Sequence, residues 1–222
     1  MAGGESSAVK RIYLSVYNWT LFFGWLLVLY RSIALLIDSG YESVYAGVET
    51  PLMIFQSAAV LEILHSLTGI VRSPASATVP QILSRLYLTW GILFSFPEIR
   101  SSRFVATMVI SWSLAEIIRY SYFGAKEAFG SAPPWLHWLR YTAFMILYLT
   151  GISSEVALVV KALPFMKLTG KYSISLPNAW NFSFDYHYNA LLVLAVYVPF
   201  SPRLYGHMLA QRKKALAKPK TH

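Results

Sequence analysis

The stretch YNWTLFFGWLLVLYRSIALLI, residues Tyr17–Ile37, decides the fold class, because it is predominantly apolar and Arg31 is its single formal charge. A helix needs about 20 apolar residues to cross a hydrocarbon core about 30 Å thick. The stretch is too long and too aromatic for the apolar part of a secretory signal peptide, and the residues before it are too polar. It therefore predicts a membrane-spanning helix near the start of the chain.

Five further apolar stretches follow, and residues that break helices separate them. They are Leu52–Val71, Val79–Phe96, Phe104–Phe123, Leu136–Leu163 and Phe184–Val198. The last stretch is the shortest, so it fits either a tilted span or a helix lying at the membrane interface. The sequence thus predicts an all-α integral membrane protein, a bundle of about six transmembrane helices that forms one domain over residues 1–222.

The composition supports this class and excludes others. Hydrophobic residues make up 56% of the chain and charged residues 13%, whereas about a quarter of a soluble domain is charged. The net charge of +9 is concentrated in a basic tail at about residues 203–222, with no motif for binding nucleic acid. The chain has no cysteine and five scattered histidines, so we expect no disulfide, no thiol nucleophile and no metal site.

The distribution of Lys and Arg predicts the orientation in the membrane. The two termini and the second and fourth connections carry most of these residues, which is typical of the cytosolic side. An even number of spans then places both termini in the cytosol. Lys218 and Lys220, in the last five residues, resemble the dilysine signal that returns proteins to the endoplasmic reticulum, so we expect that membrane as the location.

Ionisable side chains within the spans need a partner or a cavity, because each costs at least about 2.5–3.5 kcal/mol near the centre of a bilayer. Glu116 and Arg119 lie three residues apart and could pair with each other. Glu62 and His65 have the same spacing and could bridge to Gln81 or Arg85 as a structural contact between helices. Asp185 and His187 lie near a membrane surface, where solvation or helix capping is expected rather than catalysis.

The fifth stretch carries a polar stripe at alternating spacings of four and three, which places its members on one face of a regular helix. The members are His137, Tyr141, Phe144, Tyr148, Gly151 and Glu155. Tyr148 and Glu155 are seven residues apart, or about 10 Å along the axis. A phenol and a carboxyl on one inward face can form an acid–base pair; the alternative is a structural hydrogen-bonded pair.

Three arginines are predicted near the cytosolic face, namely Arg85, Arg119 and Arg140. They suit an anionic ligand that enters from the cytosol, although an ordinary belt of positive charge explains them equally well. Tyr148 would lie about 12 Å deeper than Arg140 if the helix were regular. An acyl-CoA, with its anionic head, extended arm and apolar tail, fits this layout, and the tail would lie among the helices in the bilayer.

Seven segments carry a family resemblance over nearly the whole chain. They are YLSVYNW at Tyr13–Trp19, LEILHSLTGIVRSP at Leu61–Pro74, LTWGILFSFPE at Leu88–Glu98, EIIRYSYFG at Glu116–Gly124, WLRYTAFMILY at Trp138–Tyr148, GISSEV at Gly151–Val156 and PNAWNFSFDY at Pro177–Tyr186. In these segments the chain resembles the 3-hydroxyacyl-CoA dehydratases of very-long-chain fatty acid elongation. This is the protein-tyrosine-phosphatase-like family, and the plant PASTICCINO-type members are the most similar.

The catalytic stretch of this family reads Tyr-Pro-x-Gly-x-x-x-Glu. Here Tyr148, Gly151 and Glu155 match it, and Leu149 replaces the proline. A proline would remove a backbone donor and kink the helix, so a leucine there implies a straighter helix.

The resemblance implies loss of water from a 3-hydroxyacyl-CoA to give the trans-2-enoyl-CoA, without a metal or another cofactor. Glu155 would act as the base and Tyr148 as the acid, since a phenol is ordinarily protonated and a carboxyl ionised at neutral pH. Burial of Glu155 could reverse the two roles. The three arginines would bind CoA, and supporting roles fall to Tyr141, Gly151 and Glu116.

The resemblance also implies partners in the elongation cycle, namely the condensing enzyme, the ketoacyl reductase and the enoyl reductase. Two other functions stay open. One is a non-catalytic, phosphatase-like binding or scaffold protein of the endoplasmic reticulum membrane. The other is a transporter, because buried Glu and Arg also line solute pathways, although no inverted repeat is evident.

Overall fold

The computed structural model describes residues 2–71, 73 and 75–217, and helices dominate this part of the chain. The α-helices are α1 (Ala2–Asp38), α2 (Val44–Ala58), α3 (Val60–Leu67), α4 (Ala75–Leu86), α5 (Arg103–Phe129), α6 (Pro134–Arg140), α7 (Phe144–Thr169) and α8 (Tyr186–Ala215). Short 3-10 helices η1 (Tyr41–Ser43) and η3 (Pro97–Ile99) and a π-helix η2 (Tyr87–Phe94) complete the set. The prediction of an all-α protein is confirmed.

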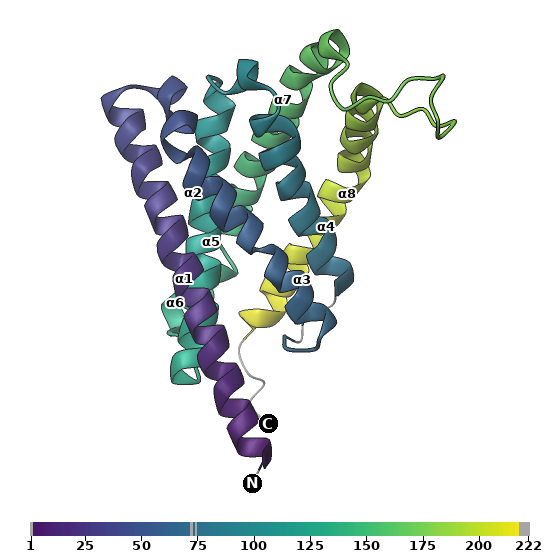
Figure 1. The fold of residues 1–222 in the computed structure, drawn as a ribbon. Helices are drawn as coiled ribbons and strands as arrows, with labels where there is room; N and C mark the ends of the chain where they lie inside the picture. Colours follow the sequence, from purple (N-terminus) through teal and green to yellow (C-terminus); the bar gives the residue numbers. More distant parts are fainter. Residues whose placement is uncertain (1, 72, 74, 218–222) are drawn as a thin grey trace.

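The long helices run up and down as one bundle (Figure 1). α5 lies between α1 and α7, α8 packs on α7, and the column formed by α4 and η2 packs against α2, α3 and α7. The first turns of α1 and the last turns of α8 lie at the same end of the bundle.

Three helical segments are long and apolar enough to cross a membrane: Ala8–Asp38, Tyr41–Leu67 and Pro134–Thr169. Much of their apolar surface faces outward, as at Phe23 and Ile146, which are 62% and 70% exposed. Such a surface suits lipid rather than water. The other three predicted spans are helical as expected, but the total of six spans and the cytosolic location of both termini remain predictions.

Two predicted helix ends are wrong: the apolar stretches stop just before Pro164 and Pro199, but the helices continue through these prolines. α7 continues through Pro164 and ends at Thr169. The next residue, Gly170, has a φ of 58°, the left-handed conformation that closes many helices. α8 contains both Pro199 and Pro202 and extends to Ala215, so the sixth helix is long rather than short. A proline inside a helix removes one backbone hydrogen bond and bends the helix, and packing on a neighbouring helix can offset that cost.

The predicted regular helix over the fifth stretch is also wrong. α6 ends at Arg140, a turn covers residues 141–143, and α7 begins at Phe144. At this junction the Met145 amide donates to the carbonyl of Thr142, three residues back, rather than four. The depth of about 12 Å expected between Arg140 and Tyr148 therefore does not apply.

A close approach joins the first turn of α8 to the π-helix η2. The Tyr186 hydroxyl donates to the carbonyl oxygen of Gly91 at 3.0 Å. A Cβ atom at Gly91 would lie 2.4 Å from that hydroxyl, so only glycine leaves room for the contact. Asp185 caps the same helix end, accepting from the amides of His187 and Tyr188 at 2.8 and 3.3 Å. The capping interpretation of Asp185 is confirmed.

Candidate active site

The carboxylate of Glu155, on α7, is held by donors from two other helices. The indole Nε1 of Trp112, on α5, donates to Oε1 at 2.8 Å. The hydroxyl of Tyr197, on α8, donates to Oε2 at 3.0 Å. Trp112 is buried, whereas Glu155 and Tyr197 are partly exposed. The carboxylate is thus held at both oxygens, by one donor from α5 and one from α8.

Tyr148 also points toward α8. Its hydroxyl donates to the backbone carbonyl of Ser201 at 3.1 Å, and its ring stacks on that of Tyr205. Ser201 and Tyr197 are four residues apart, and the Ser201 hydroxyl donates to the Tyr197 carbonyl at 2.6 Å. One turn of α8 therefore contacts both predicted catalytic side chains.

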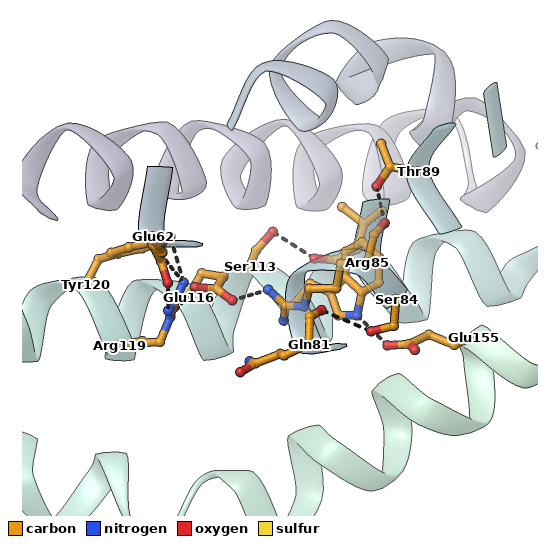
Figure 2. Close-up of polar contacts among 12 residues, drawn as sticks. Glu62, Gln81, Ser84, Arg85, Thr89, Ser113, Glu116, Arg119, Tyr120 and Glu155 are labelled. Carbon is orange, nitrogen blue, oxygen red and sulfur yellow. Dashed lines mark hydrogen bonds and ion pairs between the residues drawn. The ribbon is translucent and has the colours of Figure 1, made fainter. Parts of the chain in front are cut away.

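A row of alternating charges leads from α3 to this site (Figure 2). Arg119 donates to both oxygens of Glu62, at 2.6 and 2.8 Å, and its Nε donates to Glu116 at 2.7 Å. The other oxygen of Glu116 accepts from Arg85. Glu116 is 2% exposed. A buried carboxylate needs such paired donors to offset the cost of removing it from water.

The row ends at the candidate catalytic carboxylate. The guanidinium carbon of Arg85 lies 4.9 Å from the centroid of the Trp112 ring, within the range of a cation–π contact. The same indole donates to Glu155. Arg85 therefore joins the ion-pair network to the tryptophan that holds Glu155.

The predicted contacts of these charged residues are confirmed in one case and wrong in another. Glu116 and Arg119 do pair with each other. Glu62 does not bridge to Gln81 or Arg85, because Arg119 lies opposite it and satisfies both of its oxygens. His65 contacts the Tyr13 hydroxyl at 2.7 Å instead. The sequence places these residues on helices, but it does not show which helices are neighbours.

The three arginines predicted to bind CoA have different surroundings. Arg85 and Arg119 are ion-paired with carboxylates. Arg140 instead lies over aromatic rings, with its guanidinium carbon 4.4 Å from the centroid of Phe123 and 4.9 Å from that of Tyr122. Within the described part of the chain, Arg140 has no carboxylate at ion-pair distance. CoA binding by these arginines stays a prediction.

The predicted stripe is interrupted: Phe144, Tyr148, Gly151 and Glu155 lie on α7, but its first two members do not. His137 and Tyr141 precede α7, and their rings lie 4.9 Å apart, centroid to centroid. Gly151 is buried against α5, where an added Cβ would lie 3.9 Å from Ser111 and from Trp112, an ordinary contact distance. Gly151 therefore faces α5, as does one oxygen of Glu155 through Trp112, while Tyr148 and the other oxygen of Glu155 contact α8.

Three residues of the site escaped prediction: Trp112, Tyr197 and Ser201. Trp and Tyr are common in membrane helices for reasons unrelated to catalysis, so neither aromatic residue was singled out. The spacing of four between Tyr197 and Ser201 was a usable signal, because it places two polar side chains on one face of an apolar helix.

A hollow of about 440 Å³ lies elsewhere on α7, between α1, α5 and α7. Its lining is mainly apolar, as at Leu36, Ile110 and Leu147, with Arg103 as its charged member. Neither Tyr148 nor Glu155 lines it. Among the residues that the structure describes, no cluster of three or more His, Asp or Glu could hold a metal ion.

The fold and the site together define a helical protein with candidate membrane spans, in which a phenol and a carboxylate on α7 both contact α8. Residues 56–218 match the model of the family described as "Protein tyrosine phosphatase-like protein, PTPLA". The chain belongs to this family.

Curated relatives cover nearly the whole chain. A rice protein named very-long-chain (3R)-3-hydroxyacyl-CoA dehydratase PASTICCINO 2B is 64% identical over 217 residues, 98% of each chain. The Arabidopsis thaliana protein named PASTICCINO 2 is 59% identical over the same shares. Human very-long-chain (3R)-3-hydroxyacyl-CoA dehydratase 2 is 42% identical, over 95% of this chain and 83% of its own. No solved structure matches the chain.

Proposed function

We propose that this protein is a very-long-chain (3R)-3-hydroxyacyl-CoA dehydratase, a hydro-lyase of fatty acid elongation. Relatives 59–64% identical over 98% of the chain carry this name. We assign the reaction to Tyr148 and Glu155 because both side chains contact the same turn of α8. A phenol and a carboxylate gathered there can serve as acid and base.

The hydrogen bonds support Glu155 as the base. An indole N–H only donates, so the Glu155 oxygen that faces Trp112 accepts and carries no proton toward it. An ionised carboxylate can remove the C2 proton of the substrate, next to the thioester carbonyl.

The hydrogen bonds likewise support Tyr148 as the acid. Its hydroxyl donates to the carbonyl of Ser201, so the phenol holds a proton to give. As the C2–H electron pair forms the new double bond, the C3–O bond breaks and the leaving hydroxyl takes this proton, releasing water and the trans-2-enoyl-CoA. Transfer of a proton from Glu155 back to Tyr148 restores the starting state.

Arg140 is the best suited of the three arginines to bind the phosphates of CoA, because its guanidinium lies over aromatic rings and not against a carboxylate. Charge-assisted hydrogen bonds to phosphate are strong. The ion pairs of Arg85 and Arg119 favour a structural role for these two residues. They could contact a phosphate only through guanidinium N–H groups that the carboxylates do not occupy. The acyl chain would lie among the helices, within the bilayer.

The proposal includes a setting in the cell. We place the protein in the endoplasmic reticulum membrane as one domain over residues 1–222, with six spans, cytosolic termini and a basic tail at about 203–222. Lys218 and Lys220, the retrieval signal, lie outside the described residues. Replacement of both by Ser should move the protein out of that membrane. The other three elongation enzymes would be its partners, identified by cross-linking in intact membranes.

The test is the conversion of a long-chain 3-hydroxyacyl-CoA by the purified protein in detergent. The proposal predicts that wild type forms the trans-2-enoyl-CoA and that Glu155→Gln does not. The matched control is Glu42→Gln, the same substitution at an exposed residue that is distant in sequence from Glu155. It should be as active as wild type. A folded but inactive wild type would favour the scaffold function.

A further inference from the structure

We propose that Tyr197 is a positioning residue for the dehydration and that α8 is part of the active site through it. Its hydroxyl would orient the Glu155 carboxylate toward the substrate. This inference rests on the proposed function, since it assigns a role in that same reaction.

The geometry of the carboxylate supports this role. Tyr197 donates to one oxygen of Glu155 at 3.0 Å, and Trp112 donates to the other at 2.8 Å. A flexible Glu side chain held at both oxygens, from α8 and from α5, loses its freedom to rotate. Each carboxylate oxygen has more than one lone pair, so the two bonds still leave a site for the substrate proton.

The position of Tyr197 on α8 links the base to the acid. Ser201, one turn further on, donates through its hydroxyl to the Tyr197 carbonyl at 2.6 Å. Its own carbonyl accepts from the Tyr148 hydroxyl at 3.1 Å. The turn from residue 197 to residue 201 therefore holds the side-chain ends of both Glu155 and Tyr148, whose backbones share α7. Fixed orientation of this kind can account for a large part of a rate enhancement.

Tyr197 is assigned a positioning role rather than that of the acid because of where its proton points. The proton lies on the hydrogen bond to Glu155. To reach the leaving hydroxyl, Tyr197 would have to break the contact that holds the base. Tyr148 donates only to a backbone carbonyl, so its proton can be redirected at lower cost.

The experiment compares Tyr197→Phe with a matched control, Tyr188→Phe, in the dehydration assay. The control makes the same change on the same helix, at a side chain 69% exposed. We expect kcat of Tyr197→Phe to fall about ten- to a hundredfold, the effect of one hydrogen bond to a charged group, with KM for the acyl-CoA within about twofold. The control should match wild type, and the thermal midpoint in detergent verifies that each variant is folded.

A second variant, Trp112→Phe, removes the other donor and keeps an aromatic ring. It should also lower kcat without raising KM. The inference is overturned if kcat of folded Tyr197→Phe equals that of wild type, or if KM rises instead. It is also overturned if Tyr197→Phe is as inactive as Glu155→Gln while Tyr148→Phe stays active, since Tyr197 would then be the acid. An active Glu155→Gln would refute the catalytic pair itself, a separate outcome.

Discussion

Arg119 on α5 and Glu62 on α3 form a two-point ion pair, with Nη1 2.6 Å from Oε2 and Nη2 2.8 Å from Oε1. The side chains are 24% and 16% exposed, so the pair is largely withdrawn from solvent. Arg119 also reaches Glu116. The pair thus ties the short helix α3 to α5, the central helix of the bundle.

Replacement of Glu62 by Gln should therefore destabilise the protein, because Arg119 would keep a buried charge with one partner fewer. Removal of one partner of a buried pair costs about 3 kcal/mol. Denaturant titration in mixed micelles measures this loss, with the exposed change Glu42→Gln as the control. A Glu62→Gln protein as stable as the control would show that the ion pair is not a structural contact.

Substitution of Arg140 should affect substrate binding more than stability. If Arg140 contacts a CoA phosphate, Arg140→Gln raises KM for the acyl-CoA about tenfold, the value of one charge-assisted hydrogen bond. The matched control is Arg103→Gln, which removes the same charge at the start of α5, the opposite end of that helix from Arg140. This control should leave KM unchanged. Equal KM values for Arg140→Gln and wild type would remove Arg140 from the CoA site.

The contact between Gly91 and Tyr186 predicts a compensating pair of substitutions. Gly91→Ala would place a Cβ atom 2.4 Å from the Tyr186 hydroxyl, and such overpacking costs about 1–3 kcal/mol. Tyr186→Phe removes that oxygen, so the double variant should recover part of the loss. Thermal midpoints of the four proteins measure this. Losses that simply add would show that the hydroxyl is not the atom that excludes a side chain.

Leu149→Pro tests the departure from the family pattern. Proline at this position removes one backbone hydrogen bond of α7 and costs up to about 3 kcal/mol. The Leu149 side chain is 48% exposed, and the contacts of Tyr148 and Glu155 with α8 do not involve it. We therefore expect lower stability with activity retained. Loss of activity in a folded Leu149→Pro protein would mean that a straight α7 is required here.

Much of the fold follows from the sequence, because membrane helices are specified by local properties. Length and hydropathy indicate Tyr17–Ile37 directly, and the helix is there. The helix ends were harder to predict, since Pro164 and Pro199 have a local effect that packing overrides. The break at residues 141–143 has no glycine or proline to signal it.

The site was predicted only where its residues lie on one segment. Tyr148 and Glu155 share α7, and Glu116 and Arg119 share α5, so spacing alone relates the members of each pair. The partners Trp112 and Tyr197 reach Glu155 from other helices, and no spacing along the chain encodes that approach.

The most direct test of the acid–base pair is a double-mutant cycle on the dehydration rate, with Tyr148→Phe, Glu155→Gln and the protein carrying both changes. Residues that act as a unit give losses that do not add. We predict that each single change lowers kcat at least about a hundredfold and that the double variant is no slower than the slower single variant. Losses that multiply, or a single variant as active as wild type, would contradict a catalytic pair formed by Tyr148 and Glu155.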